Sequence, residues 1–313
     1  MDSIFTNPQD GRPRAGWRLF IQFIVMVILL GLWQIFAQAV LGGWPGQGSL
    51  AIILGGIFVV LSIWIAAKLM DRRGLSEYGL ILSRHWWKEL GAGIGLGFLG
   101  MTMLFMIMWL AGWIDFVGWG WEQSHSYPYV VLFIGYFCAM AAVGFYEELL
   151  ARGYQTKNLA EGLEYWFDGR TAALFAVAGS SVIFGLLHIG NPHASWISTL
   201  NITLAGVLLG LPFIISNSLA LPIGLHFSWN FFQGGIYGFA VSGNPARESI
   251  IQITVEGPEY LSGGRFGPEG GFIGTGVIIF LICLILAYYK SGETWLSVSP
   301  ELTAPPRLFD PPK

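Results

Sequence analysis

The chain has 313 residues, of which 54% are hydrophobic and only 11% are charged, and its formal net charge is −3. Soluble domains carry about 25% charged residues, so this composition predicts a protein that crosses a membrane several times rather than a soluble enzyme. The sequence has no long basic run, which argues against nucleic-acid binding. Its two cysteines, Cys138 and Cys283, lie in apolar runs and suggest neither a disulfide framework nor a cysteine zinc cluster.

Three membrane spans are expected in the N-terminal part of the chain. A polar segment over residues 1–18 is followed by an apolar run over 19–41, and further apolar runs cover about 51–70 and 90–113. The first run contains Ala37-Gln38-Ala39, which resembles a signal-peptide cleavage site. That run is longer than the roughly 7–15 apolar residues of such a signal, so we expect an uncleaved first span.

Five more spans are expected in the rest of the chain. They cover about 128–147, 171–188, 197–215, 219–240 and 272–289. The helix of the first of these is expected to continue outside the membrane to about Leu163. A Gly-rich polar loop covers 241–271, and a Pro-rich tail follows the last span. The sequence thus predicts an all-α fold, a polytopic membrane bundle of about eight transmembrane helices.

The expected organisation is one bundle without internal repeats. Its parts are an N-terminal segment (1–18), three spans (19–127), a core with spans four to seven (128–240), an outer loop with the last span (241–290) and a tail expected to be disordered (291–313). Eight spans place both termini on one side. Segments on that side hold 14 of the 16 Lys and Arg residues, and only Arg247 and Arg265 lie on the other. The positive-inside rule therefore predicts cytoplasmic N- and C-termini for a multi-pass protein of the cell membrane, plasma or inner.

Two adjacent carboxylates and an arginine lie at the end of the fourth apolar run. Ionisable residues at membrane depth are costly and therefore indicate function. Glu148 and Arg152 are four residues apart with the acid first, which is the favourable order for an ion pair on a helix. Glu147 points about 100° away from Glu148 around the helix, so we expect it to face another partner. The Glu148–Arg152 pair is expected to be structural.

Two later stretches supply candidate partners for Glu147. Phe184 and His188 lie at the end of the fifth span, and His226 and Asn230 lie one turn apart in the seventh. If spans four and five form a hairpin that turns near 164–168, the helical rise of 1.5 Å per residue brings Glu147 within about one turn of His188. The remaining histidines, His85, His125 and His193, are expected in loops or at the membrane surface.

These residues allow two chemical interpretations, and both lead to hydrolysis of an amide bond. In the first, a carboxylate and a histidine in a partly wet apolar cavity activate a water, while a second histidine and an asparagine amide donate to the oxyanion. In the second, Glu147, His188 and His226 are three ligands of a zinc ion whose fourth position holds water. The same residues serve either mechanism, so the sequence leaves both open.

These three motifs resemble those of the CAAX protease and bacteriocin-processing family (CPBP, also called ABI) of intramembrane proteases. The family pattern is Glu-Glu-x-x-x-Arg, then Phe-x-x-x-His, then His-x-x-x-Asn or Asp. The chain reads Glu147-Glu148-Leu-Leu-Ala-Arg152, Phe184-Gly-Leu-Leu-His188 and His226-Phe-Ser-Trp-Asn230. The resemblance covers about 128–240, and Ala151 departs from the aromatic residue that the family often has before the arginine.

The resemblance implies an eight-span helical fold with a catalytic cavity inside the membrane. It implies that Glu147 and His188 activate water, that His226 and Asn230 are oxyanion or ligand partners, and that Glu148, Arg152 and Phe184 support them. The family is commonly called a metalloprotease family, which implies zinc as the alternative cofactor. Eukaryotic relatives remove the last three residues of prenylated CAAX proteins.

From these observations we expect an intramembrane endopeptidase that cleaves membrane-associated proteins or peptides, in contact with the lipid bilayer and without nucleic acid. One alternative is a catalytically silent immunity or binding protein of the same fold. Another is a proton-coupled transporter that uses Glu147 and His188 as a relay, but the repeated halves typical of transporters are missing from the sequence.

Overall fold

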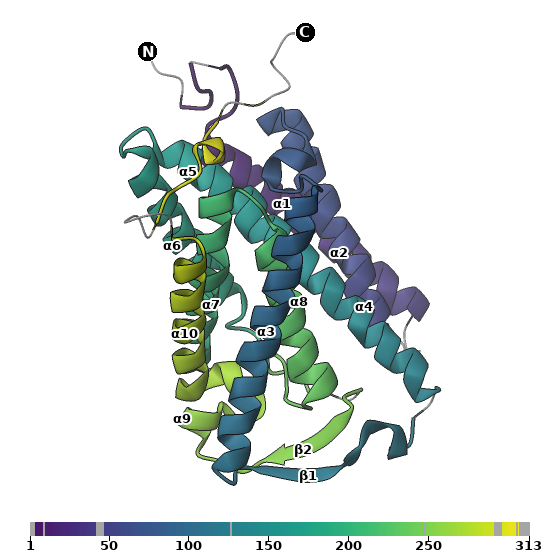
Figure 1. Cartoon of the computed structure of the whole chain (residues 1–313). Helices are drawn as coiled ribbons and strands as arrows, with labels where there is room; N and C mark the ends of the chain where they lie inside the picture. The colour runs from purple at the N-terminus through teal and green to yellow at the C-terminus, as the bar shows by residue number, and fades with distance from the viewer. Residues whose placement is uncertain are drawn as a thin grey trace.

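The protein is a bundle of antiparallel helices, seen in a computed structural model that describes residues 4–8, 10–41, 47–125, 127–246, 248–290, 296–304 and 306. Eight helices of the described chain form the bundle, and a small sheet lies across one end of it (Figure 1). These helices are α1 (Ala15–Leu41), α2 (Gln47–Ala66), α3 (Arg84–Leu110), α4 (Tyr129–Glu148), α6 (Gly169–Leu187), α7 (Trp196–Ser216), α8 (Ala220–Asn230) and α10 (Phe272–Tyr288).

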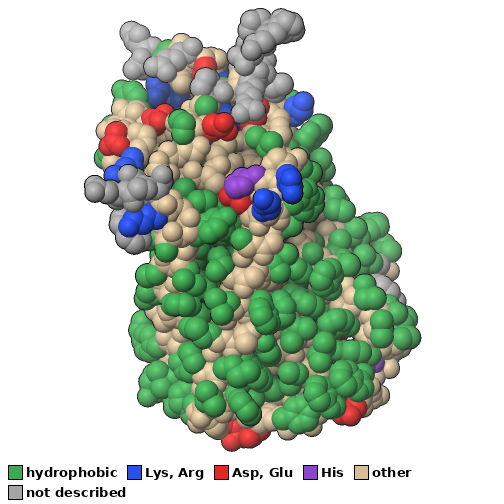
Figure 2. All heavy atoms as spheres, viewed as in Figure 1, with side chains coloured by type: hydrophobic (Ala, Val, Ile, Leu, Met, Phe, Trp, Pro, Cys, Tyr) green, Lys and Arg blue, Asp and Glu red, His purple; other side chains and the backbone are tan. Residues whose placement is uncertain are grey.

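The lengths and surfaces of these helices fit a membrane. Among the described residues, six helices are long and apolar enough to cross one, and α10 is a shorter apolar helix. The 11-residue α8 is extended by the π-helical turn Phe231–Ile236. Figure 2 shows hydrophobic side chains over most of the visible face, while Lys and Arg gather toward one end. The prediction of an all-α, polytopic membrane bundle is confirmed, and the chain is a multi-pass membrane protein.

The two ends of the bundle differ in what they carry. The first and last described segments, 4–8 and 296–304, lie at one end, which we call the termini end (Figure 1). The opposite end carries the strands β1 (Ile114–Trp119) and β2 (Ile251–Val255), and we call it the sheet end. This arrangement agrees with an even number of membrane crossings.

The sheet end contains structure that the sequence analysis does not predict. Strands β1 and β2 pair antiparallel, with Ile114 opposite Val255 and Trp119 opposite Ile251. The sequence predicts an all-α fold with a polar loop over 241–271, so neither strand is expected. Strands of five or six residues from distant parts of the chain leave little local signal. Short helical pieces complete this end: Gly120–Glu122, α9 (Glu259–Ser262), Gly264–Phe266 and Pro268–Gly270.

Helices α3 and α8 cross at unusually close range because glycines lie at the crossing. A Cβ atom added at Gly93 would lie 2.3 Å from the Leu221 carbonyl oxygen, and one at Gly224 would lie 2.3 Å from the Leu90 carbonyl oxygen. In lipid the hydrophobic effect does not drive helices together, so membrane helices associate through close packing at small residues such as these. The contact buries α8 in the centre of the bundle, where it carries His226 and Asn230.

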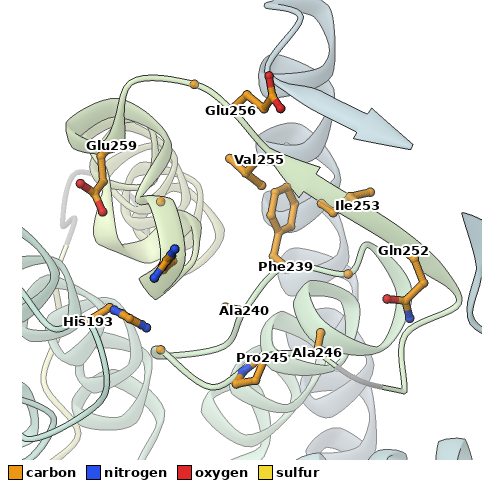
Figure 3. Close-up of a pocket in the computed structure, with 15 residues that line it drawn as sticks. His193, Phe239, Ala240, Pro245, Ala246, Gln252, Ile253, Val255, Glu256 and Glu259 are labelled. Atoms are coloured by element: carbon orange, nitrogen blue, oxygen red, sulfur yellow. The ribbon is translucent and has the colours of Figure 1, made fainter. Parts of the chain in front are cut away.

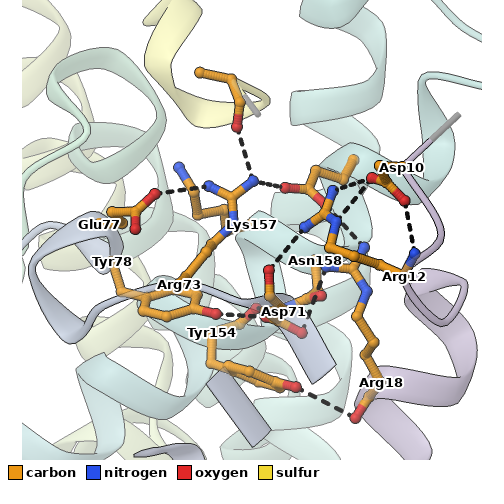
Figure 4. Close-up of polar contacts among 12 residues, drawn as sticks. Asp10, Arg12, Arg18, Asp71, Arg73, Glu77, Tyr78, Tyr154, Lys157 and Asn158 are labelled. Carbon is orange, nitrogen blue, oxygen red and sulfur yellow. Dashed lines mark hydrogen bonds and ion pairs between the residues drawn. The ribbon is translucent and has the colours of Figure 1, made fainter. Parts of the chain in front are cut away.

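The termini end is packed by a buried polar cluster (Figure 4). Glu161 forms ion pairs with three arginines, at 2.8 Å to Arg18, at 3.3 Å to Arg12 and with Arg73. Asp71 accepts a hydrogen bond from the Asn158 amide at 2.9 Å and another from the Tyr78 hydroxyl. The cluster connects α1, the π-helical turn Ala67–Asp71 after α2 and the helix α5 (Lys157–Leu163) through buried polar contacts.

Part of the C-terminal tail completes this layer. The sequence predicts disorder over 291–313, whereas the structure describes residues 296–304 packed against the helices. The 3₁₀ turn Pro300–Leu302 buries Leu302 completely, and the Ser299 amide donates to the Ile214 carbonyl at 2.8 Å. Arg73 and Lys157 each donate to a tail carbonyl at 2.7 Å. Buried cations at the termini end thus hold polar groups of a tail whose composition alone suggests disorder; residues 291–295, 305 and 307–313 lie outside the described residues.

Candidate active site

The first motif lies where α4 passes into the π-helical turn Leu149–Thr156, within one continuous helical segment over Tyr129–Leu163. This confirms the expected extension to Leu163. Glu148 and Arg152 are almost completely buried, and the arginine Nη1 lies 2.9 Å from the Glu148 Oε1. The guanidinium also donates to the Gly206 carbonyl at 3.3 Å. The expected ion pair is therefore present, and it lies inside the bundle between α4, α6 and α7.

Glu148 also holds a histidine, a contact that the sequence analysis missed. The His226 Nδ1 lies 2.7 Å from the same Glu148 Oε1 that pairs with Arg152. An ionised carboxylate only accepts hydrogen bonds, so Nδ1 carries the proton and donates it to Glu148. The ring is thereby oriented with its Nε2 toward Glu147, whose Oε2 lies 3.9 Å away. This distance is too long for a direct hydrogen bond.

His188 is held in a different way. It caps the C-terminal end of α6, and its Nδ1 lies 2.7 Å from the Phe184 carbonyl oxygen. A carbonyl accepts only, so Nδ1–H donates and Nε2 is left as an acceptor. Between Glu147 and His188 no hydrogen bond or ion pair exists in the described part of the chain, whereas Glu147 approaches His226. Glu147 and His188 nevertheless line the same cavity.

The Phe184 ring lies among the charged and ionisable groups. Its centroid is 4.7 Å from that of His188 and 6.1 Å from that of His226, and the Arg152 guanidinium carbon lies 4.4 Å from it. An arginine over an aromatic face is stabilised by the electron density of the ring. Phe184 thus packs against Arg152 and against both histidines.

The four residues with predicted chemical roles share one cavity of about 710 Å³. Glu147, His188, His226 and Asn230 all line it, and the Glu147 side chain is 23% exposed. Apolar side chains of α1 and α2, among them Met26 and Ile52, also line it. The other three histidines lie elsewhere. His85 is exposed on α3, His125 bonds to the Gly120 carbonyl, and His193 lines a second cavity at the sheet end (Figure 3).

The residues do not form a metal centre as they stand. Across the described part of the chain, no three His, Cys, Asp or Glu side chains come together closely enough to hold a metal ion. The His226 Nδ1 bonds to Glu148 and the His188 Nδ1 to the Phe184 carbonyl, the kind of contact that also orients metal-ligating histidines, so the Nε2 atom of each ring stays available. As placed, Glu147, His188 and His226 are not close enough together to hold one ion, and the zinc site stays a prediction.

A third carboxylate in the cavity wall, Glu269, comes from the loop before α10. Its Oε1 accepts from the Ser242 amide at 2.6 Å and from the Ser242 hydroxyl at 3.1 Å, and its Oε2 accepts from the Gln233 amide. Burial raises the pKa of the Glu269 carboxyl to about 7, although these hydrogen bonds act in the opposite direction. The sequence offered one signal for this residue, a glutamate inside an otherwise Gly-rich stretch.

We expect Glu269→Gln to raise the melting temperature at pH 8 and to change it little at pH 5. A folded-state pKa near 7, above the ordinary 4.5, means that stability is lost as the pH rises from about 4.5 through 7. Ionisation of the buried Glu269 lowers the free energy of unfolding by about 3 kcal/mol at pH 8, and Gln stays neutral and avoids this loss. Thermal denaturation of the purified protein at both pH values measures this. The matched control is Glu259→Gln, on the exposed α9, and an equal change at both pH values for Glu269→Gln would contradict the assignment.

A model of a known protein family matches the part of the chain that carries the three motifs. The family model described as "Type II CAAX prenyl endopeptidase Rce1-like" matches residues 128–232, a range that begins just before α4 and ends just after Asn230. It contains all seven residues of the three motifs. Comparisons with curated proteins and with solved structures found no match.

Proposed function

We propose that the chain is an intramembrane endopeptidase in which Glu147 activates the attacking water, and the match of residues 128–232 to the Rce1-like type II CAAX prenyl endopeptidase family model supports this. The observation that carries the proposal is the convergence of Glu147, His188, His226 and Asn230 on one cavity. The substrate is proposed to be a membrane-associated protein or peptide, because the cavity has an apolar wall from α1 and α2.

In the proposed mechanism Glu147 is the general base. Its carboxylate reaches the cavity and has no arginine or lysine partner within 4 Å among the described residues, so it is free to take a proton from water. The His188 Nε2, left as an acceptor by the bond from Nδ1 to Phe184, accepts a second hydrogen bond from that water. Two acceptors on one water orient its lone pair toward the substrate carbonyl.

His226 and Asn230 are proposed to stabilise the oxyanion. With Nδ1 donating to Glu148, the His226 Nε2 donates only when the ring is doubly protonated. The Asn230 amide supplies a second donor one turn along α8. Glu148 is then a positioning residue as well as the partner of Arg152.

A comparison of peptide termini tests the function. Membranes of cells with the wild-type protein are expected to contain cleaved termini that are missing from cells with Glu147→Ala. The matched control is Glu164→Ala, in the exposed turn before α6, which should give the wild-type pattern. Identical termini in all three samples would favour the silent immunity or binding protein. Metal analysis of active protein, before and after chelation, tests the zinc alternative.

A further inference from the structure

One face of the two-stranded sheet is apolar and is turned toward the helices. Ile251 and Ile253, two residues apart on β2, point to the same face, and both pack against the core cluster that contains Phe239. Figure 3 shows the Phe239 ring turned toward β2. The partners of these isoleucines on β1 are Trp119 and Phe116, and residues opposite each other on paired strands share a face. The Trp119 and Phe116 rings therefore belong to the apolar face.

The other face of the sheet is polar. It carries Asp115 and Thr254, which lie opposite each other and are both exposed. The second pair on this face is Gly118 with Gln252, so no large apolar side chain of the paired positions points outward. An apolar face toward the bundle and a polar face away from it are what a sheet lying flat on a membrane surface requires.

The helices leave part of the apolar face uncovered. Phe116 is 57% exposed, Trp119 is 39% exposed and Trp121, just after β1, is 53% exposed. The three rings touch one another: Phe116 meets Trp119 edge-on at 5.2 Å between centroids, and Trp121 stacks on Trp119 at 5.0 Å. Trp121 in turn lies 6.4 Å from the ring of Tyr129, the first residue of α4. These three rings, which we call the aromatic row, thus lead from the sheet to a membrane helix.

Lipid is the partner that fits the aromatic row. The row is continuous with the exposed apolar side chains Val130, Val131 and Ile134 on the first turns of α4, which begins a segment long and apolar enough to cross a membrane. Tryptophan rings gather where a membrane meets water. Residues 111–128 contain two acidic residues and no Lys or Arg, so they do not attract anionic headgroups.

The free edge of β1 limits how deep the sheet can lie. In the described part of the chain the sheet has two strands, so one edge of β1 has no strand partner. Backbone groups at such an edge are costly in hydrocarbon, whereas water among the lipid headgroups satisfies them. The strand backbone must therefore stay at headgroup depth while the rings reach toward the acyl chains.

We propose that the sheet end is an interfacial anchor, in which Phe116, Trp119 and Trp121 bind the lipid surface and hold β1 at headgroup depth. The contact is with neutral phospholipid and needs no anionic headgroup. Because β1 leads through Gly120–Glu122 into α4, the anchor also sets the depth of the helix that carries Glu147. The lipid contact does not depend on catalysis.

Fluorescent labels on single cysteines test the anchor in phosphatidylcholine nanodiscs that hold one copy of the protein each. In a background with Cys138→Ser and Cys283→Ser, we compare Phe116→Cys on the apolar face with Thr254→Cys on the polar face. Lipid with a nitroxide near the glycerol end of its acyl chains should quench the label at Phe116→Cys more strongly, by about twofold or more, and aqueous iodide should show the reverse order. Val131→Cys, exposed on α4, gives the quenching of a lipid-facing position.

Equal quenching of the two labels by iodide would show that the sheet stands in water. Little quenching of Phe116→Cys by either agent would show that protein covers the row, and strong lipid quenching at both positions would place the sheet too deep; each result would overturn the proposal. Phosphatidylglycerol added to the nanodiscs should leave the ratio unchanged, and a large increase would overturn the assignment to neutral lipid. If Phe116→Cys does not fold, as judged by its melting temperature, Trp121→Cys provides the same test.

Discussion

Replacement of Glu147 by Gln is expected to lower the rate of peptide cleavage by about 10²–10⁴-fold, the usual contribution of a general base. Gln has nearly the same size and still forms hydrogen bonds, but it cannot take a proton from water. The Glu147 side chain is 23% exposed in the cavity and forms no close ion pair in the described structure, so its removal should leave folding unchanged. The assay is cleavage of a substrate found by the comparison of termini, with the melting temperature measured on the same samples.

The matched variant is Glu148→Gln. Glu148 is fully buried and holds both Arg152 and His226, so this change should lower stability as well as cleavage. If Glu147→Gln cleaves at the wild-type rate while Glu148→Gln is folded and inactive, the roles of the two glutamates are reversed. Normal cleavage by both variants would place the reaction elsewhere in the chain.

Replacement of Arg152 by Ala is expected to destabilise the protein by about 3–5 kcal/mol, because it leaves the buried Glu148 carboxylate without its cation. Arg152 is 1% exposed, lies 2.9 Å from Glu148 and packs on the Phe184 ring, so water cannot take its place without opening the core. The measurement is thermal denaturation of the purified protein, together with its level in membranes.

Two further variants separate charge from packing. Arg170→Ala, at the exposed start of α6, removes an arginine without a buried partner and should change the melting temperature little. The double variant Arg152→Met with Glu148→Gln removes both charges and should recover much of the stability lost in Arg152→Ala. A fully stable but inactive Arg152→Ala would show instead that this arginine acts in the chemistry.

The membrane architecture could be predicted from the sequence. Apolar runs of about 20 residues read directly as spans, because each backbone polar group in lipid must be satisfied within a helix. The Glu148–Arg152 ion pair could also be predicted from the sequence, because residues four apart on a helix are neighbours whatever the tertiary structure. The three motifs could also be placed in separate spans, although their roles stay predictions.

The tertiary structure alone decided what lies between these elements. The bond from His226 to Glu148 joins residues 78 positions apart, and no local spacing indicates it. Three other contacts also join distant parts of the chain and have no local signal. They are the pairing of β1 with β2, the burial of Leu302 in the tail and the place of Glu269 in the cavity wall. Helix periodicity and hydropathy indicate which segments are helical and which of them lie in lipid. The contacts named above depend instead on which helices pack together and at what depth in the membrane. That packing places Glu148 against His226 and brings Glu147, His188 and Asn230 to one cavity.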